Sequence, residues 1–384
     1  MTREDFYSIF IYILMAVIIL VTGFTVIRPA MEEGYLAVSA GSNFAFLLLA
    51  LIISVLINVI LLEIGHLIGA KLGGYNVILF NILGLCFYKK EENGKLVTKF
   101  KFKSFDGFTG ETLIEPKKDK SNPMFYVFVP LILMLLEFVA LYCVMTFIPS
   151  STSTDQILLY VKYGVVVLAA IAGCFIVYNY FPARMDTLTD GYRLVLLNKK
   201  VNVEAYNLKL EVEANKFFNR PAKELEPFTV ITDFTARTNM EIILNKLEQD
   251  KYDEASNIID LTLKEDKKIS RATKTEFLLT KAYLMFMNEE LEEASKFYID
   301  TFDNEMKSKI RSCKDYAEIR TYILYEGLVE KTKSEIDFAI DRKKKLDKKV
   351  SDGEAIKEGI LINKALEKVY STNPELKCEE KKEA

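Results

Sequence analysis

The sequence predicts an α-helical polytopic membrane protein with four spans and a small cytoplasmic β-ribbon, followed by a soluble all-α domain. Two observations predict this class. Half of the 384 residues are hydrophobic, yet 27% are charged, a mixture that is unusual for one globular domain. The apolar residues gather in four long runs in the first half of the chain, whereas charged residues dominate the second half. The net charge of -3 gives no reason to expect a nucleic-acid partner.

Each of the four apolar runs is long enough to cross a bilayer, since about 20 apolar residues span its hydrocarbon core. They cover residues 6–27, 46–72, 124–148 and 157–178. The first run follows an N-terminal segment with acidic residues, which favours a retained anchor over a cleaved signal peptide. The third run contains Pro130 and Glu137. We therefore predict a membrane anchor with an outer loop over 1–44 and the main membrane domain over 45–198.

The distribution of Lys and Arg in the loops predicts the orientation of the chain. Nine lysines lie between the second and third spans, whereas the other two loops hold only Arg28. The lysine-rich loop should therefore be cytoplasmic, and with four spans both termini are cytoplasmic as well. Glu63 and His66 then lie near the cytoplasmic end of the second span. Asp190 follows the fourth span at the same membrane depth.

The lysine-rich loop predicts a β-ribbon over residues 75–115. Gly73 and Gly74 break the preceding helix, and the segment 92–94 (Glu-Asn-Gly) is a hairpin turn signal. Residues 95–103 alternate apolar and basic residues at period two, as a half-buried strand does. Two roles for this strand stay open: a solvated face near anionic lipid, or an edge strand that pairs with an extended substrate.

The charged half of the chain predicts a linker over 199–238 and a cytoplasmic helical domain over 239–376. Residues 251–255 and 290–294 resemble each other, 39 positions apart. Each should open the second helix of a pair, as in tetratricopeptide-like repeats. We expect a protein partner to bind this domain, because stacked helix pairs commonly present a concave docking surface. Further helices are predicted over 322–346 and 356–370, and a disordered tail over 377–384.

The most informative motif is the segment 62–66, Leu-Glu-Ile-Gly-His, at the end of the second span. Its histidine, His66, is the only one in the protein, and a carboxylate, Glu63, precedes it by three residues. Such groups are costly to bury in an apolar segment and indicate function. The segment differs from the zinc motif H-E-x-x-H only in that Leu62 replaces the first histidine.

A second motif follows the fourth span, where Asn179 and Pro182 precede the pair Asp190-Gly191. Pro182 disfavours helix at Phe181, and Asn179 could bond to backbone carbonyls that the break frees. A helix restarting near Thr187 or Thr189 would hold Asp190 in its first turn, where the helix dipole favours the ionised carboxylate.

These motifs, in this order and at one membrane depth, resemble the site-2 protease family of intramembrane zinc metallopeptidases, peptidase family M50, over about residues 45–198. The resemblance implies that His66 and Asp190 are zinc ligands and that Glu63 is the base that activates a zinc-bound water. It also implies that Asn179, Pro182 and Gly191 lie at the substrate groove. The chain departs from the family at Leu62, and the spacer between its last two motifs is longer.

Leu62 decides between an active and an inactive site. Leucine has no lone pair, a catalytic zinc normally keeps three protein ligands, and no second histidine exists in the chain. Asp186 is the best local substitute for the missing ligand. We therefore expect no zinc, and a zinc-deficient pseudoprotease that binds or regulates a membrane or peptide substrate.

Two alternatives stay open. One is an active intramembrane zinc metalloendopeptidase in which Asp186 replaces the missing ligand. The other is a membrane-anchored helical-repeat adaptor. In each case we expect contact with membrane lipid. For the pseudoprotease and for the active metalloendopeptidase we also expect a transmembrane or leader-peptide segment as partner. Heavy use of Lys, Ile and Asn indicates a bacterial plasma membrane as the location.

Overall fold

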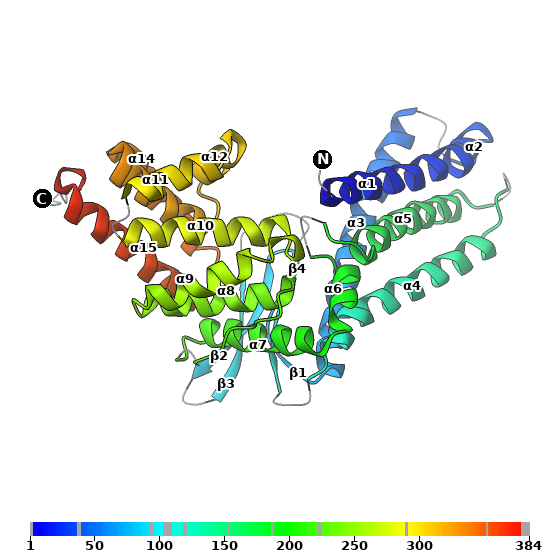
Figure 1. Ribbon diagram of the computed structural model, residues 1–384. Helices are drawn as coiled ribbons and strands as arrows, with labels where there is room; N and C mark the ends of the chain where they lie inside the picture. The colour runs from blue at the N-terminus through cyan, green and yellow to red at the C-terminus, as the bar shows by residue number, and fades with distance from the viewer. Residues whose placement is uncertain are drawn as a thin grey trace, which may run out of the picture. The chain divides into compact units, whose positions relative to one another are not determined.

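The computed structural model is mostly helical and divides into two compact units, residues 1–210 and 211–384 (Figure 1). It describes residues 3–36, 40–92, 95–102, 110–117, 121–151, 154–185, 188–221, 224–288, 291–350 and 352–377. Four helices are long and apolar enough to cross a membrane, and one small antiparallel sheet accompanies them. This part of the predicted class is confirmed. The predicted disordered tail lies outside the described residues, apart from residue 377.

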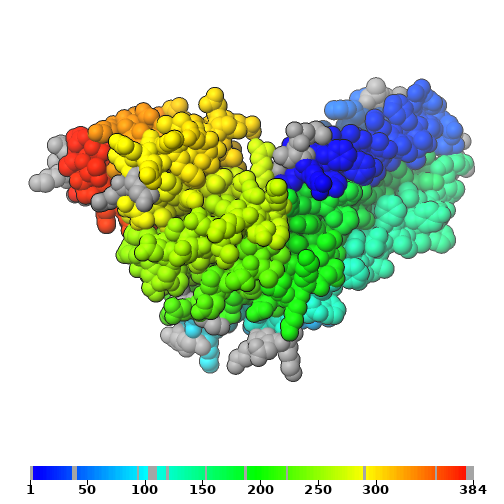
Figure 2. Space-filling view, viewed as in Figure 1, coloured from blue at the N-terminus to red at the C-terminus, as the bar shows by residue number. Residues whose placement is uncertain are grey.

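The first unit contains the four candidate spans and the sheet. Its elements are α1 (Arg3–Thr22), a π-helical turn (Gly23–Ile27), α2 (Arg28–Glu32), α3 (Ala40–Leu72), β1 (Tyr75–Ile82), β2 (Leu85–Glu92), β3 (Lys95–Phe102), β4 (Gly110–Pro116), α4 (Pro123–Phe147), α5 (Gln156–Tyr180), α6 (Asp190–Leu197) and α7 (Lys200–Phe217), which continues into the second unit. The candidate spans are Arg3–Glu32, Gly41–Leu72, Pro123–Phe147 and Gln156–Tyr180. Most apolar side chains of α1 are exposed on the surface drawn in blue in Figure 2, as expected of a helix that faces lipid.

Three glycines allow α3 to approach α4 closely. They are spaced four residues apart and lie against α4 and the residue before it: Gly65 against Pro130, Gly69 against Tyr126, and Gly73 against Asn122. A Cβ atom at any of the three would overlap the facing chain. Small residues at such an interface let two helix backbones pack without intervening side chains. The pairing also shows that α3 and α4 run antiparallel.

The same register brings two polar residues to one level of the α3–α4 interface. Asn58 lies seven residues before Gly65 on α3, and Glu137 lies seven residues after Pro130 on α4. Asn58 is fully buried and its Nδ2 donates to the Ser54 carbonyl at 2.9 Å. Its Oδ1 and both carboxylate oxygens of Glu137 are buried without a hydrogen-bond partner among the described residues. Asn58 and Glu137 therefore bring three hydrogen-bond acceptor atoms to this interface without a donor for any of them among the described residues.

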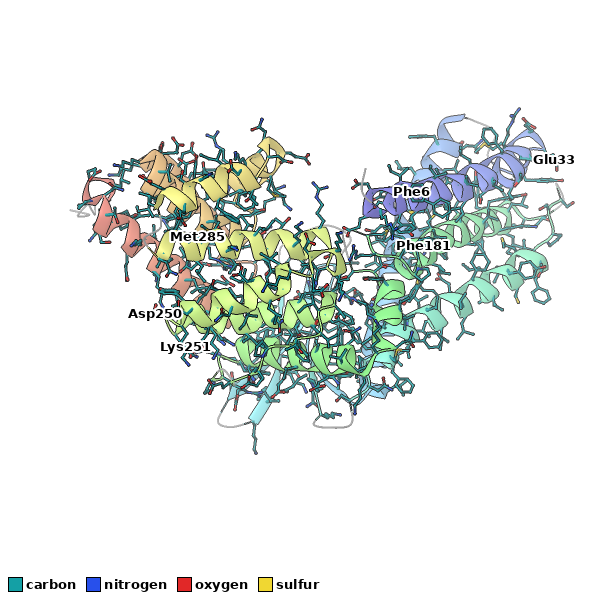
Figure 3. All side chains as sticks on the ribbon, in the orientation of Figure 1. Phe6, Glu33, Phe181, Asp250, Lys251 and Met285 are labelled. Atoms are coloured by element: carbon teal, nitrogen blue, oxygen red, sulfur yellow. The ribbon has the colours of Figure 1, made fainter. Side chains whose placement is uncertain are left out.

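The ends of several helices lie close together at one end of the helix bundle. Glu4 of α1 pairs with Arg184, beyond α5, at 2.8 Å. Phe181, labelled in Figure 3, lies with its ring against the rings of Tyr7 and Phe10 on α1. The Tyr180 hydroxyl donates to the Val127 carbonyl on α4 at 3.3 Å. The start of α1, the start of α4 and the end of α5 therefore lie together, at the end where α3 enters the sheet.

The sheet has the strand order β3-β2-β1-β4, and all its pairs are antiparallel. Glu92 pairs with Lys95, and residues 93–94 of the predicted turn lie outside the described residues. Residues 95–103, which correspond to β3, were predicted to form a half-buried strand, and this prediction is wrong. Nearly all of β3 is exposed, with Phe102 67% accessible, because β3 is an outer strand that only β2 flanks.

The second unit is all helical in its described part. It contains the end of α7, then α8 (Asp233–Glu248), α9 (Tyr252–Leu263), a 3-10 turn (Asp266–Lys268), α10 (Arg271–Met287), α11 (Leu291–Thr301), α12 (Asn304–Arg311), α13 (Tyr316–Tyr325), a π-helical turn (Glu326–Glu330), α14 (Lys333–Asp347), α15 (Asp352–Thr372) and a 3-10 turn (Pro374–Leu376). The predicted linker 199–238 thus contains α7 and the first turns of α8. Ala255 on α9 and Ala294 on α11, from the two similar segments, are both fully buried.

The segment predicted as helical over 322–346 is helical but interrupted. α13 ends at Tyr325 and continues as a π-helical turn, and α14 begins only at Lys333. The break lies at Lys331, whose φ of 54° is left-handed and cannot continue a right-handed helix. The apolar spacing is similar on both sides of this residue, so the periodicity of the sequence did not reveal the break.

We predict that Glu137→Gln stabilises the protein in detergent by about 1 kcal/mol. The amide removes an ionisable group from an apolar interface and supplies a donor for the Asn58 Oδ1 atom. Thermal unfolding followed by circular dichroism measures the change. Glu137→Leu is the control, because it removes the charge without supplying a donor and should stabilise less. A lower unfolding midpoint for Glu137→Gln than for the unmodified protein would contradict the prediction.

Candidate functional site

Two helices position the predicted site residues. Glu63 and His66 are three residues apart on α3 and therefore share one face of it, and both are buried, with 8% and 7% exposed. Asp190 is the first residue of α6, which Thr189 caps by accepting the Tyr192 N–H. The predicted helix restart with Asp190 in its first turn is confirmed.

The structure brings His66 and Asp190 together across 124 positions of sequence. The Nε2 atom of His66 lies 3.3 Å from the Oδ2 atom of Asp190. The other ring nitrogen, Nδ1, lies 3.1 Å from the Tyr126 carbonyl, to which it donates. The Tyr126 ring also lies against the imidazole, with centroids 4.7 Å apart. These contacts fix the plane of the His66 ring and direct Nε2 at the carboxylate.

Arg193 completes the surroundings of Asp190. Its guanidinium lies 3.3 Å from Oδ1, the carboxylate oxygen that His66 does not contact. Burial alone would raise the pKa of Asp190, but His66 and Arg193 together lower it below its ordinary value. The carboxylate is therefore ionised at neutral pH, with a basic group at each oxygen. Arg193 was not among the predicted site residues, although its position three residues after Asp190 on a helix is a signal for such a pair.

Glu63 faces the sheet. Its Oε2 accepts a hydrogen bond from the Thr112 hydroxyl of β4 at 2.9 Å. Gly110, at the start of β4, lies so close to the Glu63 side chain that a Cβ atom there would overlap it. The Tyr126 hydroxyl donates to the Thr112 carbonyl at 3.2 Å and joins α4 to the same strand. No local pattern points to Thr112 or Tyr126, because only the packing of β4 on α3 brings them here.

These residues surround a pocket of about 310 Å³ that is lined by α3, β4, α4, the end of α5 and the start of α6. Leu62 and Asn179 also line it. The Nδ2 atom of Asn179 donates to the Phe175 carbonyl in its own helix at 3.0 Å. α5 ends at Tyr180, and Phe181 before Pro182 is extended, as predicted.

Gly191 allows α6 to begin beside the end of α5, because a Cβ atom there would overlap the Tyr180 carbonyl. This close approach sets the position of Asp190 next to His66. The Asp-Gly pair therefore has a packing role in addition to any chemical one. Asp186, the predicted substitute ligand, lies outside the described residues.

The residues present do not form a complete zinc site. Two ligand atoms of a tetrahedral zinc lie about 3.4 Å apart, so the 3.3 Å between His66 and Asp190 is compatible with two ligands. A third donor is missing where Leu62 lines the pocket. No group of three or more His, Cys, Asp or Glu side chains that could hold a metal occurs within the described part of the chain. Arg193 already provides a positive charge to Asp190.

Comparisons with known proteins identify no relative. No protein-family model, curated protein or solved structure matches this chain. The resemblance to site-2 proteases therefore depends on the sequence motifs alone.

We predict that His66→Ala and Asp190→Ala each destabilise the protein by about 3 kcal/mol, since each removes one member of a buried charged pair. The double variant should lose little more than either single variant. Unfolding in a denaturing detergent titration gives the three free energies. Strictly additive losses would show that the two side chains do not interact.

Proposed function

We propose that the protein is a site-2-protease-like integral membrane protein that binds a membrane or peptide segment without cleaving it. The observation that carries the proposal is the double engagement of Asp190. One carboxylate oxygen faces His66 and the other faces Arg193, so the protein itself supplies the positive charge that a metal would otherwise supply. Leu62, which cannot bind a metal, occupies the wall of the same pocket.

The pocket offers an extended peptide a place beside β4. Within the described residues β4 pairs only with β1, so its other edge has no paired strand, and Glu63 lies beside it. Open edges accept an added strand through backbone hydrogen bonds. The strand first considered for this role, residues 95–103, corresponds to β3 at the opposite edge of the sheet. We therefore assign the peptide-binding edge to β4, with Glu63 and Asn179 as polar groups along it.

The proposal places the chain in a bacterial plasma membrane with both termini in the cytoplasm. The lysines between the second and third spans support this orientation. The second unit would then be a cytoplasmic, tetratricopeptide-like domain that docks a protein partner. Its helix pairs α8–α9 and α10–α11, each packed at a buried alanine, support that assignment.

One observation favours the alternative, an active zinc metalloendopeptidase. A metal-ligating histidine almost always donates its second ring N–H to a carbonyl or carboxylate, as His66 does to the Tyr126 carbonyl. This alternative requires a third donor, for which Asp186 is the candidate. Zinc would hold His66 and Asp190 and supply an activated water.

Leu62→His tests the choice between these functions. Residue 62 lies one helical turn before His66, so the new imidazole adds the missing third donor on the same face. We expect zinc near zero in the purified unmodified protein, and about one zinc per chain in the variant, by elemental analysis.

The gained zinc should disappear when His66→Ala is added to Leu62→His. Leu61→His is the matched control, because that position does not line the pocket. One zinc per chain in the unmodified protein, lost in both His66→Ala and Asp190→Ala, would support the active enzyme instead and make Asp186 the next ligand to test.

Photo-crosslinking tests the peptide-binding edge. A photoreactive residue at Glu111, an exposed position of β4 beside the pocket, should capture a synthetic single-span peptide with a flexible polar tail. The same group at Lys99 of β3 should capture much less. Equal capture at both strands, or capture at β3 alone, would overturn the assignment of β4.

A further inference from the structure

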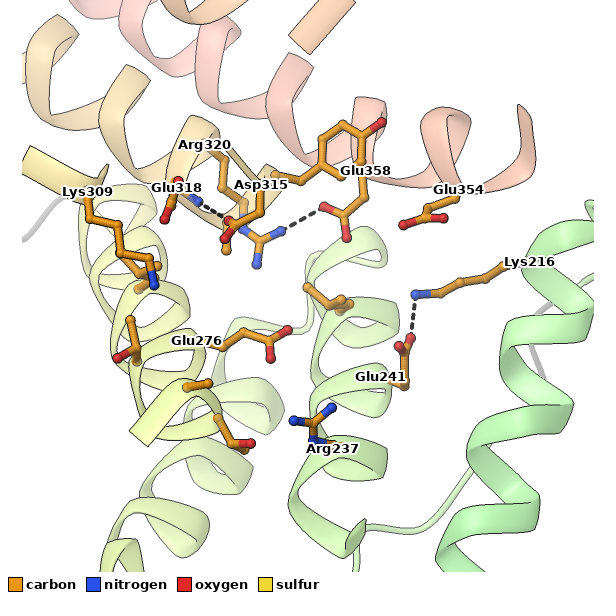
Figure 4. Close-up of a pocket in the computed structure, with 17 residues that line it drawn as sticks. Lys216, Arg237, Glu241, Glu276, Lys309, Asp315, Glu318, Arg320, Glu354 and Glu358 are labelled. Carbon is orange, nitrogen blue, oxygen red and sulfur yellow. Dashed lines mark hydrogen bonds and ion pairs between the residues drawn. The ribbon is translucent and has the colours of Figure 1, made fainter. Parts of the chain in front are cut away.

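The second unit contains a charged pocket of about 400 Å³ that lies between α7, α8, α10, α13 and α15 (Figure 4). Four basic side chains and six carboxylates line it, which gives an excess of negative charge. The carboxylates belong to Glu241, Glu276, Asp315, Glu318, Glu354 and Glu358. Charges held this close together need compensation, because burial removes the water that would otherwise solvate them.

Two of the basic side chains are engaged with two of these carboxylates. Lys216 pairs with Glu241, and the Arg320 Nη1 atom pairs with Glu358 at 2.7 Å (Figure 4). The Nη2 atom of Arg320 donates to the Thr280 hydroxyl at 3.2 Å. These pairs leave the excess charge on the remaining carboxylates.

Two further carboxylates bind backbone N–H groups at the start of α13. Asp315 accepts from the Glu318 N–H, and Glu318 accepts from the Lys314 N–H, each at 2.8 Å. Backbone N–H groups carry no full charge that would balance a carboxylate. Burial, followed by the charge of Asp315, therefore raises the pKa of Glu318 to about 7. Burial also raises the pKa of Glu276 and of Glu354.

The Nε–H group of Arg320 and the carboxylate of Glu276 are the two groups that point to a ligand. The Arg320 side chain is 1% exposed, and its Nε–H has no hydrogen-bond acceptor among the described residues. The Glu276 carboxylate extends into the middle of the pocket, and no hydrogen bond or ion pair of that carboxylate occurs within the described residues (Figure 4). A matching ligand would bring a cation for Glu276 and an oxygen acceptor for Arg320.

We propose that this pocket binds an arginine or lysine side chain from an extended segment of a partner protein. The cation of that side chain contacts Glu276, and a backbone carbonyl of the segment accepts the Arg320 Nε–H. A basic residue within a peptide carries both groups a few bonds apart, and the pocket volume suits a side chain with its flanking backbone. The proposal gives the chemistry of the docking partner and does not depend on the function proposed for the first unit.

Binding should strengthen as pH rises from 6 to 8. Glu318 is largely protonated below pH 7 and ionised above it, and only the ionised form attracts a cation. The pKa of Glu276 is also raised, because burial and the charge of Glu241 oppose its ionisation more than Arg237 and Arg320 favour it. Its ionisation should therefore strengthen binding over the same change in pH. Asp315 also faces this group and adds negative charge.

The test uses the full-length protein in detergent micelles and two blocked tripeptides, Gly-Arg-Gly and its citrulline analogue. Citrulline has nearly the shape of arginine but no charge. Saturation-transfer NMR on the peptides gives both affinities. We expect the arginine peptide to bind at least about tenfold more tightly than the citrulline peptide, because a charged hydrogen-bonded contact is lost in the analogue.

Glu276→Gln should reduce the affinity for the arginine peptide by about tenfold and leave the citrulline peptide unaffected. Glu292→Gln, at an exposed position of α11, is the matched control and should change neither affinity. Absence of binding, or equal affinity for the two peptides, would overturn the proposal. If Glu276→Gln does not fold by circular dichroism, the comparison of the two peptides on the unmodified protein decides alone.

Discussion

The membrane unit depends on the contact between Asp190 and His66. An ionised carboxylate at the first residue of a short helix would be costly among apolar spans without compensation. His66 and Arg193 each engage one of its oxygens, and the Tyr126 carbonyl fixes the imidazole from the opposite side. These contacts hold the start of α6 against α3 and α4. His66, Asp190 and Arg193 form a polar wall of the pocket.

That contact is possible only because the surrounding backbones approach closely. Glycines on α3 let it pack directly on α4, Gly191 lets α6 begin against the end of α5, and Gly110 brings β4 against Glu63. A larger residue at any of these positions would move one wall of the pocket. The glycines thus determine how closely the charged groups approach one another.

The four long apolar helices were predictable, because a run of apolar residues sets the length of such a helix. The motif order also led us to expect His66 and Asp190 at one site, where the structure brings them together. Arg193 could have been found from its helical spacing to Asp190. Thr112 and Tyr126 could not, since the packing of β4 and of α4 against α3 brings them to Glu63 and His66. The same limit applies to β3, whose alternating pattern predicted burial although the sheet leaves it at an open edge.

Buried carboxylates have opposite electrostatic surroundings in the two units. At the membrane site, the protein supplies a basic partner for each oxygen of Asp190, and the pKa of that carboxylate falls. In the second unit, the carboxylates outnumber the basic side chains and burial raises the pKa values of Glu276, Glu318 and Glu354. A bound cation adds little electrostatic stabilisation to a site whose charge is already balanced. It adds much to a site with an excess of negative charge. The electrostatics therefore favour the second unit as the place where this chain recognises a cationic partner.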